Sequence, residues 1–205
     1  MWKILDLFKR NKGREPIYIV SGLPRSGTSM MMKMLVAGGM EPVKDDLRKA
    51  DEDNPKGYYE FERVKKLNEG DTAWLDEARG KVVKVISALL PHLPETYEYR
   101  IIFMRRHMAE ILASQQKMLI RRGEDPAKVD NDKMAALFEK HLGDTFAWLK
   151  SQENVTSKTI SYNELLKDPS GLILEVNRFF GNILDEAEMG RIIDPNLYRQ
   201  KNVKK

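Results

Sequence analysis

The chain has 205 residues, of which 41% are hydrophobic and 32% charged, and this composition predicts a globular protein with one domain spanning residues 1–205. It contains no cysteine, which excludes disulfides and thiolate metal sites, and its three histidines lack the spacing of a metal site. The net charge of +4 is a small excess that suits an anionic ligand, and no basic block has the form of a nucleic-acid-reading motif.

Residues 1–14 mix apolar and basic side chains over a stretch too short and too charged for a transmembrane helix or a signal peptide. We therefore expect a cytoplasmic protein with this segment packed on its own domain. Weak contact with a membrane surface or a partner is the alternative, because a helix here would be amphipathic with a basic flank.

A glycine-containing loop follows the first predicted strand, residues 17–20, and precedes an apolar helix over residues 30–36. This order presents backbone N–H groups and a positive helix end to an anion. Gly22 and Gly27 have the spacing of a Walker A loop, but Thr28 stands where that motif has lysine. The cation lies inside the loop, at Arg25, so the pattern predicts an oxyanion cradle for a ligand other than ATP.

The residues of this loop resemble the 5′-phosphosulfate loop of the sulfotransferases that use 3′-phosphoadenosine-5′-phosphosulfate (PAPS). Many members of that family have lysine where Arg25 stands. The resemblance implies a cosubstrate-binding loop made of Pro24, Arg25, Ser26, Gly27, Thr28 and Ser29.

A polar stretch without apolar periodicity, residues 41–62, predicts a long loop near the cradle. Its segment Asn54-Pro55-Lys56-Gly57-Tyr58-Tyr59-Glu60 resembles the N-P-x-G-[aromatic]-x-E segment of many bacterial and Golgi-type sulfotransferases. A surface turn at Asn54-Pro55 and Gly57 explains the same residues equally well.

The middle of the chain predicts a helix over 64–79 stopped by Gly80, a strand over 81–86, a turn or short helix over 89–94 and a strand over 99–104. The strand over 99–104 places Arg106 at the edge where open α/β sheets bind ligands. Ser114 follows eight residues later, as in the family pattern R-x-P-x-x-x-x-x-S, although the proline is absent. The resemblance implies that Arg106 and Ser114 bind the 3′-phosphate; ordinary surface residues are the alternative.

The last third predicts a helix over 132–151, a strand over 157–162 and a helix over 172–180. Residues 162–169 resemble the family segment Y-E-D-L-x-x-D-P, departing from it at Asn163 and Glu164. Residues 192–201 predict a basic loop that closes over the nucleotide, with a frayed tail as the alternative. The long helix carries a predicted core stripe of Met134, Leu137, Phe138, Leu142, Phe146 and Leu149.

These elements predict an α/β fold, and the resemblance implies a three-layer, P-loop NTPase-like form with a short parallel sheet of four to five strands flanked by helices. It further implies transfer of a sulfuryl group from PAPS to an acceptor hydroxyl, leaving 3′-phosphoadenosine-5′-phosphate (PAP) and using no metal. The expected acceptor is a small molecule, a glycan or a lipid. A kinase with a degenerate P-loop and a catalytically silent PAP- or PAPS-binding protein are the other hypotheses.

The predicted catalytic residues are Arg25, which stabilises charge on the bridging oxygen, and a base for the acceptor hydroxyl. Cytosolic family members use the histidine of a K-T-H-L segment, and Ile86 replaces it here. A carboxylate is therefore the expected base. Glu60 is the first choice, and the alternatives are Asp45, Asp46 and Asp51.

Overall fold

The computed structural model describes residues 15–45, 59–125 and 129–193, and five parallel strands form its sheet in the order β2-β3-β1-β4-β5. This arrangement confirms the predicted α/β fold with a short parallel sheet flanked by helices. The strands are β1 (Ile17–Gly22), β2 (Pro42–Val43), β3 (Val82–Lys84), β4 (Tyr99–Arg105) and β5 (Val155–Ser161).

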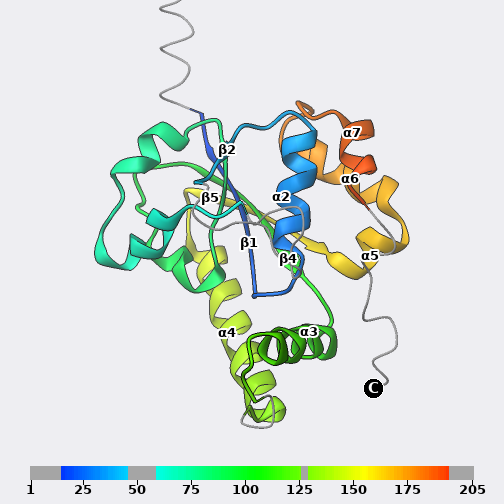
Figure 1. The fold of residues 1–205 in the computed structure, drawn as a ribbon. Helices are drawn as coiled ribbons and strands as arrows, with labels where there is room; N and C mark the ends of the chain where they lie inside the picture. The colour runs from blue at the N-terminus through cyan, green and yellow to red at the C-terminus, as the bar shows by residue number, and fades with distance from the viewer. Residues whose placement is uncertain (1–14, 46–58, 126–128, 194–205) are drawn as a thin grey trace, which may run out of the picture.

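Two helical layers cover the two faces of the sheet (Figure 1). One layer contains α2 (Thr28–Ala37), α5 (Tyr162–Lys167), α6 (Pro169–Phe179) and α7 (Glu186–Arg191). The other contains α4 (Asn131–Ser151) and three 3₁₀ helices, η1 (Glu62–Glu69), η2 (Ala73–Ala78) and η3 (Ser87–His92). Helix α3 (Met108–Arg121) lies beyond the ends of β1 and β4.

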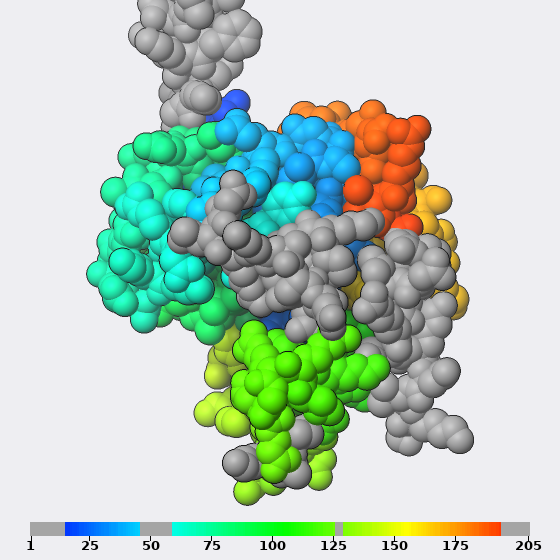
Figure 2. Space-filling model, viewed as in Figure 1, coloured from blue at the N-terminus to red at the C-terminus, as the bar shows by residue number. Residues whose placement is uncertain are grey.

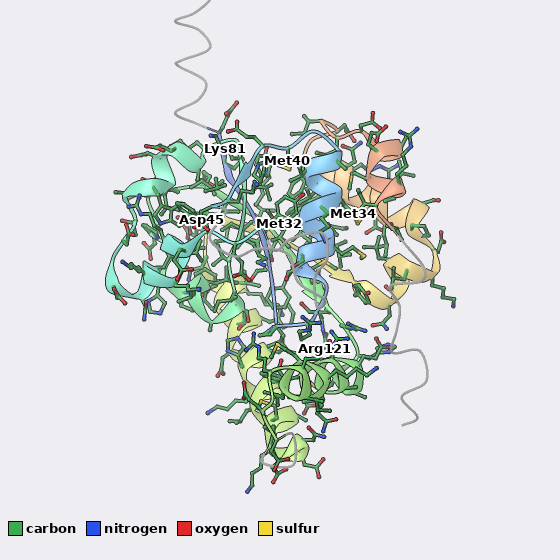
Figure 3. The ribbon with its side chains drawn as sticks, viewed as in Figure 1. Met32, Met34, Met40, Asp45, Lys81 and Arg121 are labelled. Carbon is green, nitrogen blue, oxygen red and sulfur yellow. The ribbon has the colours of Figure 1, made fainter. Side chains whose placement is uncertain are left out.

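The alternation of side chains along the strands divides the core between these layers. On β1, Tyr18 and Val20 pack with α2 and α6, whereas Ile17 and Ile19 pack with η1, η2 and α4. Helix α2 contributes its methionines to the first core; Figure 3 shows Met32 and Met34 on this helix and Met40 just beyond it. Every residue of β1 is buried, as a central parallel strand requires.

The helix predicted over 64–79 is wrong, because the structure divides it into η1 and η2. Gly70 has φ 85°, a left-handed conformation that ends η1. Val64 and Leu67 are the buried residues of η1, and their separation of three aligns them on one face of a 3₁₀ helix. The elements that were not predicted include β2, which lies inside the expected long loop, and α7.

The predicted core stripe of α4 is correct only toward its C-terminal end. Leu149 is buried, and Leu142 and Phe146 pack against the second core. Leu137 is 64% exposed, because the first half of α4 extends past the sheet beside α3 (Figure 1).

Within the described ranges, no helix combines the length and apolar character needed to cross a bilayer. The amphipathic segment 1–14 and the basic segment from residue 194 onward lie outside those ranges.

Candidate active site

The loop between β1 and α2 lies at the carboxyl ends of the strands, where parallel α/β sheets bind ligands. Strand β1 is central, with β3 on one side and β4 on the other, so segments that follow all three strands meet at this loop. Figure 2 shows the surface of α3 below that of α2 and α7, on the side to which β1 and β4 run in Figure 1.

A tight turn shapes the loop. The Ser26 N–H donates to the Leu23 carbonyl at 3.2 Å, with Pro24 second and Arg25 third in the turn. Arg25 has φ 69°, and a positive φ at the third position with proline at the second is typical of a type II turn. Glycine usually occupies that third position, and a side chain there costs on the order of 1 kcal/mol. The arginine therefore occupies a strained position that contacts elsewhere must hold.

The structure brings together three residues that the sequence predicted for this site. The Arg25 Nε donates to the Ser114 Oγ on α3 at 2.9 Å. The Arg106 Nη1, at the end of β4, donates to the Arg25 carbonyl at 3.2 Å. Arg106 and Ser114, which follow Arg25 by 81 and 89 positions in the sequence, thus both contact it. Ser114 is 8% exposed, so the alternative of an ordinary surface serine is wrong.

Two contacts that sequence reasoning missed hold Arg106. Its Nε donates to the Glu110 Oε2 at 2.8 Å, and the two side chains are only 8% and 7% exposed. Its guanidinium also lies over the Tyr162 ring, 4.5 Å from the centroid, as a cation–π pair. The separation of four between Arg106 and Glu110, across the start of α3, was the one available signal in the sequence.

The rest of the predicted loop also lies at the start of α2. Gly27 is the N-cap residue with φ 102°, and Thr28 and Ser29 begin the helix, half-buried. The hydroxyl of Ser26 is fully buried and, among the described residues, has no hydrogen-bond partner. The Ser21 Oγ on β1 is the other such hydroxyl in the described part of the chain, and a buried donor without a partner is costly.

Gly27 lies directly against the Tyr162 ring, and a Cβ built at Gly27 would be 2.4 Å from the ring's Cδ2. We expect Gly27→Ala to lower the free energy of unfolding by about 1–3 kcal/mol more than Gly39→Ala, because overpacking adds this amount to the backbone strain. Gly39 is a matched control: its φ is 105°, and nothing lies within 4 Å of a Cβ added there. Urea unfolding of both variants measures the difference, and equal losses would contradict the close approach.

Glu60, the predicted base, forms an ion pair with Lys84, Oε1 to Nζ 3.3 Å. Lys84 lies opposite Val20 in the β1–β3 register, two residues before β1 ends. The pair therefore lies near the carboxyl end of β1, where the loop begins. The Asp45 Oδ2 accepts from the Glu62 N–H at 2.6 Å, so this carboxylate has a structural partner. The other two alternatives, at positions 46 and 51, lie outside the described residues.

Ile86 follows β3 and is 47% exposed, so an apolar side chain occupies the position that matches the family histidine. Beside it, the Ser87 Oγ lies 2.8 Å from the His141 Nε2 on α4. His141 thus joins η3 to α4. Its Thr145 neighbour donates a hydroxyl to the His141 carbonyl at 2.7 Å.

Comparison with known proteins gives structural likeness without sequence likeness. No protein-family model and no curated protein matches the sequence. The structure is similar to the sulfotransferase STF1 from Mycobacterium tuberculosis H37Rv, with a TM-score of 0.59, 17% sequence identity, and 94% of this chain and 74% of that chain covered. It is also similar to the sulfotransferase domain from the curacin biosynthetic pathway, with a TM-score of 0.53, 16% identity, and coverage of 88% and 78%. The chain therefore has the sulfotransferase fold.

Proposed function

We propose that the protein is a sulfotransferase that moves a sulfuryl group from PAPS to an acceptor hydroxyl. The observation that carries the proposal is the convergence of Arg25, Arg106 and Ser114 on the loop between β1 and α2. An ATP-dependent kinase is less well supported, because Thr28 replaces the lysine that binds the β- and γ-phosphates.

The loop residues are suited to hold the 5′ end of the cosubstrate. The helix start at Thr28 and Ser29 has no acidic residue in its first turn, so its N–H groups and dipole favour an anion. The guanidinium of Arg25, held by Ser114, is the cation inside the loop.

Arg106 and Ser114 are the proposed ligands of the 3′-phosphate. A guanidinium has five N–H donors, and the bonds from Arg106 to Glu110 and to the Arg25 carbonyl use two of them. Arg106 can therefore hold the loop and donate to a phosphate oxygen at the same time. Its burial and its cation–π contact with Tyr162 fix the guanidinium plane, which favours bidentate recognition.

The transfer itself breaks one S–O bond and forms another. The bond from sulfur to the bridging phosphate oxygen breaks, the acceptor oxygen bonds to sulfur, and the acceptor proton moves to a base. Negative charge grows on the bridging oxygen, where the Arg25 guanidinium stabilises it. We propose that Glu60 takes the proton, with its carboxylate oriented by Lys84.

We expect PAP to bind more tightly than ADP, because only PAP carries a 3′-phosphate. Arg106→Ala should remove most of this difference, about 2–3 kcal/mol, the contribution of a hydrogen bond between charged groups. Isothermal titration calorimetry with both nucleotides measures it. Arg105→Ala is the control, since Arg105 is an exposed arginine beside Phe146 on the same strand end. Equal affinity of the wild type for PAP and ADP would refute the assignment.

A catalytically silent PAP-binding protein is the second candidate, and the apolar Ile86 at the position of the family histidine favours it. The two candidates differ in turnover. Formation of PAP from PAPS in the presence of phenols or alcohols supports the transferase, whereas tight PAP binding without any turnover supports the silent protein.

A further inference from the structure

A continuous chain of hydrogen bonds links α5 and α3 to the loop between β1 and α2, residues 23–27, which we call the phosphate loop after its proposed ligand. The His107 main-chain N–H donates to the Asn163 Oδ1 at 3.1 Å, and the Asn163 Nδ2 donates to the Glu110 Oε1 at 2.8 Å. The Glu110 Oε2 accepts from the Arg106 Nε at 2.8 Å, and the Arg106 Nη1 donates to the Arg25 carbonyl at 3.2 Å. We call these four bonds the relay.

The direction of every bond in the relay is determined by its ends. A main-chain N–H can only donate, so the oxygen of the Asn163 amide must face His107 and its NH₂ must face Glu110. On the other side, the guanidinium of Arg106 can also only donate. Glu110 therefore receives donors on both oxygens, and a carboxylate is the group that satisfies both. A glutamine at position 110 has almost the same shape but would set its NH₂ against one of these donors.

The relay ends on the peptide group between Arg25 and Ser26, next to the non-glycine residue of the loop that has a positive φ. The carbonyl it holds belongs to Arg25, whose φ is 69°. The N–H of the same peptide, from Ser26, donates to Leu23 across the turn. Both polar groups of this peptide are thus fixed, one by the turn and one by Arg106. Orientation of the peptide determines where the Arg25 side chain leaves the loop.

We propose that Glu110 and Asn163 are positioning residues, which act through Arg106 to hold the turn at Arg25 in the conformation that binds the 5′-phosphate. The assignment of that phosphate rests on the proposed function. The position of the relay supports it, since Glu110 is 5% exposed and its carboxylate contacts the Arg106 guanidinium directly. The negative charge of Glu110 opposes anion binding, so its contribution to affinity must come from geometry.

A polarity exchange tests this proposal. Each single variant leaves one mismatched pair. In Glu110→Gln, the NH₂ at position 110 faces another donor. In Asn163→Asp, the carboxylate at position 163 faces that of Glu110. The double variant restores complementarity. Its carboxylate at position 163 accepts from the His107 N–H and from the amide NH₂ at position 110, and the amide oxygen at position 110 accepts from Arg106. Glu164→Gln is the control, an exposed acid-to-amide change beside Asn163.

We expect each single variant to weaken both PAP and ADP about tenfold in calorimetry, the order of one hydrogen bond to a charged group, and the double variant to recover most of the loss. ADP should weaken as well as PAP, because both present a 5′-phosphate to the loop; any additional loss for PAP reflects Arg106, the proposed ligand of its 3′-phosphate. Single variants with wild-type affinity, a double variant no better than the worse single one, or a loss confined to PAP would overturn the proposal.

Hydrogen exchange of residues 22–30 without nucleotide gives a second readout that is independent of the ligand. Faster exchange in both single variants and recovery in the double variant are expected, because the relay holds the turn before any nucleotide binds. Unchanged exchange in the single variants would refute the relay. If the wild type binds neither PAP nor ADP, the proposed function fails, and the exchange result still decides whether the relay holds the loop.

Discussion

Replacing Arg25 with alanine is expected to lower kcat by about 100- to 1000-fold, the range observed when one oxyanion donor is removed. The affinity for PAP should change much less. The reason is that charge on the bridging oxygen grows only as the S–O bond breaks, so the guanidinium acts mainly on the transition state. Single-turnover formation of PAP from PAPS, with a phenol as acceptor, measures the rate, and calorimetry measures the affinity.

The Arg25 side chain also donates to Ser114, so the experiment needs a variant that breaks this bond and keeps the cation. Ser114→Ala does so, and its kcat should remain well above that of Arg25→Ala. Parallel losses of PAP affinity and kcat in Arg25→Ala would show uniform binding instead and would contradict the proposed role.

Replacing Glu60 with glutamine is expected to lower kcat by about 100- to 10,000-fold, the usual range for loss of a general base, while PAP binding is retained. Glutamine keeps the shape and can still accept a hydrogen bond from Lys84. The loss should shrink along a series of acceptors with increasingly acidic hydroxyls, because these need less help from a base. Rates across such a series of phenols and alcohols give the dependence.

Asp45→Asn is the matched control for Glu60→Gln. The Asp45 main-chain N–H donates to the Glu60 carbonyl at 2.9 Å, so the two residues are neighbours, but the Asp45 carboxylate already accepts from Glu62. The control should therefore keep near wild-type turnover. Full activity of Glu60→Gln at every pH would exclude Glu60. Loss of turnover in Asp45→Asn would then transfer the role to Asp45, and full activity of both variants would leave the alternatives at positions 46 and 51.

The sequence predicted those parts of the molecule that depend on local patterns. The run from Ile17 to Val20 is apolar because β1 is buried on both faces, and the glycines that follow mark the loop. The spacing of Arg106 and Ser114 was also informative, since a strand end and the next helix place them on one side of the sheet. The prediction of one helix over 64–79 was wrong because, in a short segment, the apolar spacing of a 3₁₀ helix cannot be told from that of an α-helix.

Contacts between distant segments could not be predicted, because no local pattern encodes them. Tyr162 was predicted as the end of a strand and the first residue of a family segment, with no partner, yet its ring contacts both Gly27 and Arg106. Asn163 departs from the family pattern, and its partner Glu110 lies 53 residues earlier. The order of the strands brings these residues together, and that order depends on the whole chain.

The packing of the Tyr162 ring against Gly27 has a consequence for synthesis on the ribosome. Gly27 is made early, but Tyr162 follows about 135 residues later. At about 5–20 residues per second, this interval lasts roughly 7–27 s. Throughout it, β1 and the start of α2 exist without a complete β5 and without the Tyr162 ring, and Arg106, which is made before Tyr162, lacks the ring over which its guanidinium lies. The loop between β1 and α2 therefore cannot take its final form until β5 and Tyr162 have been translated.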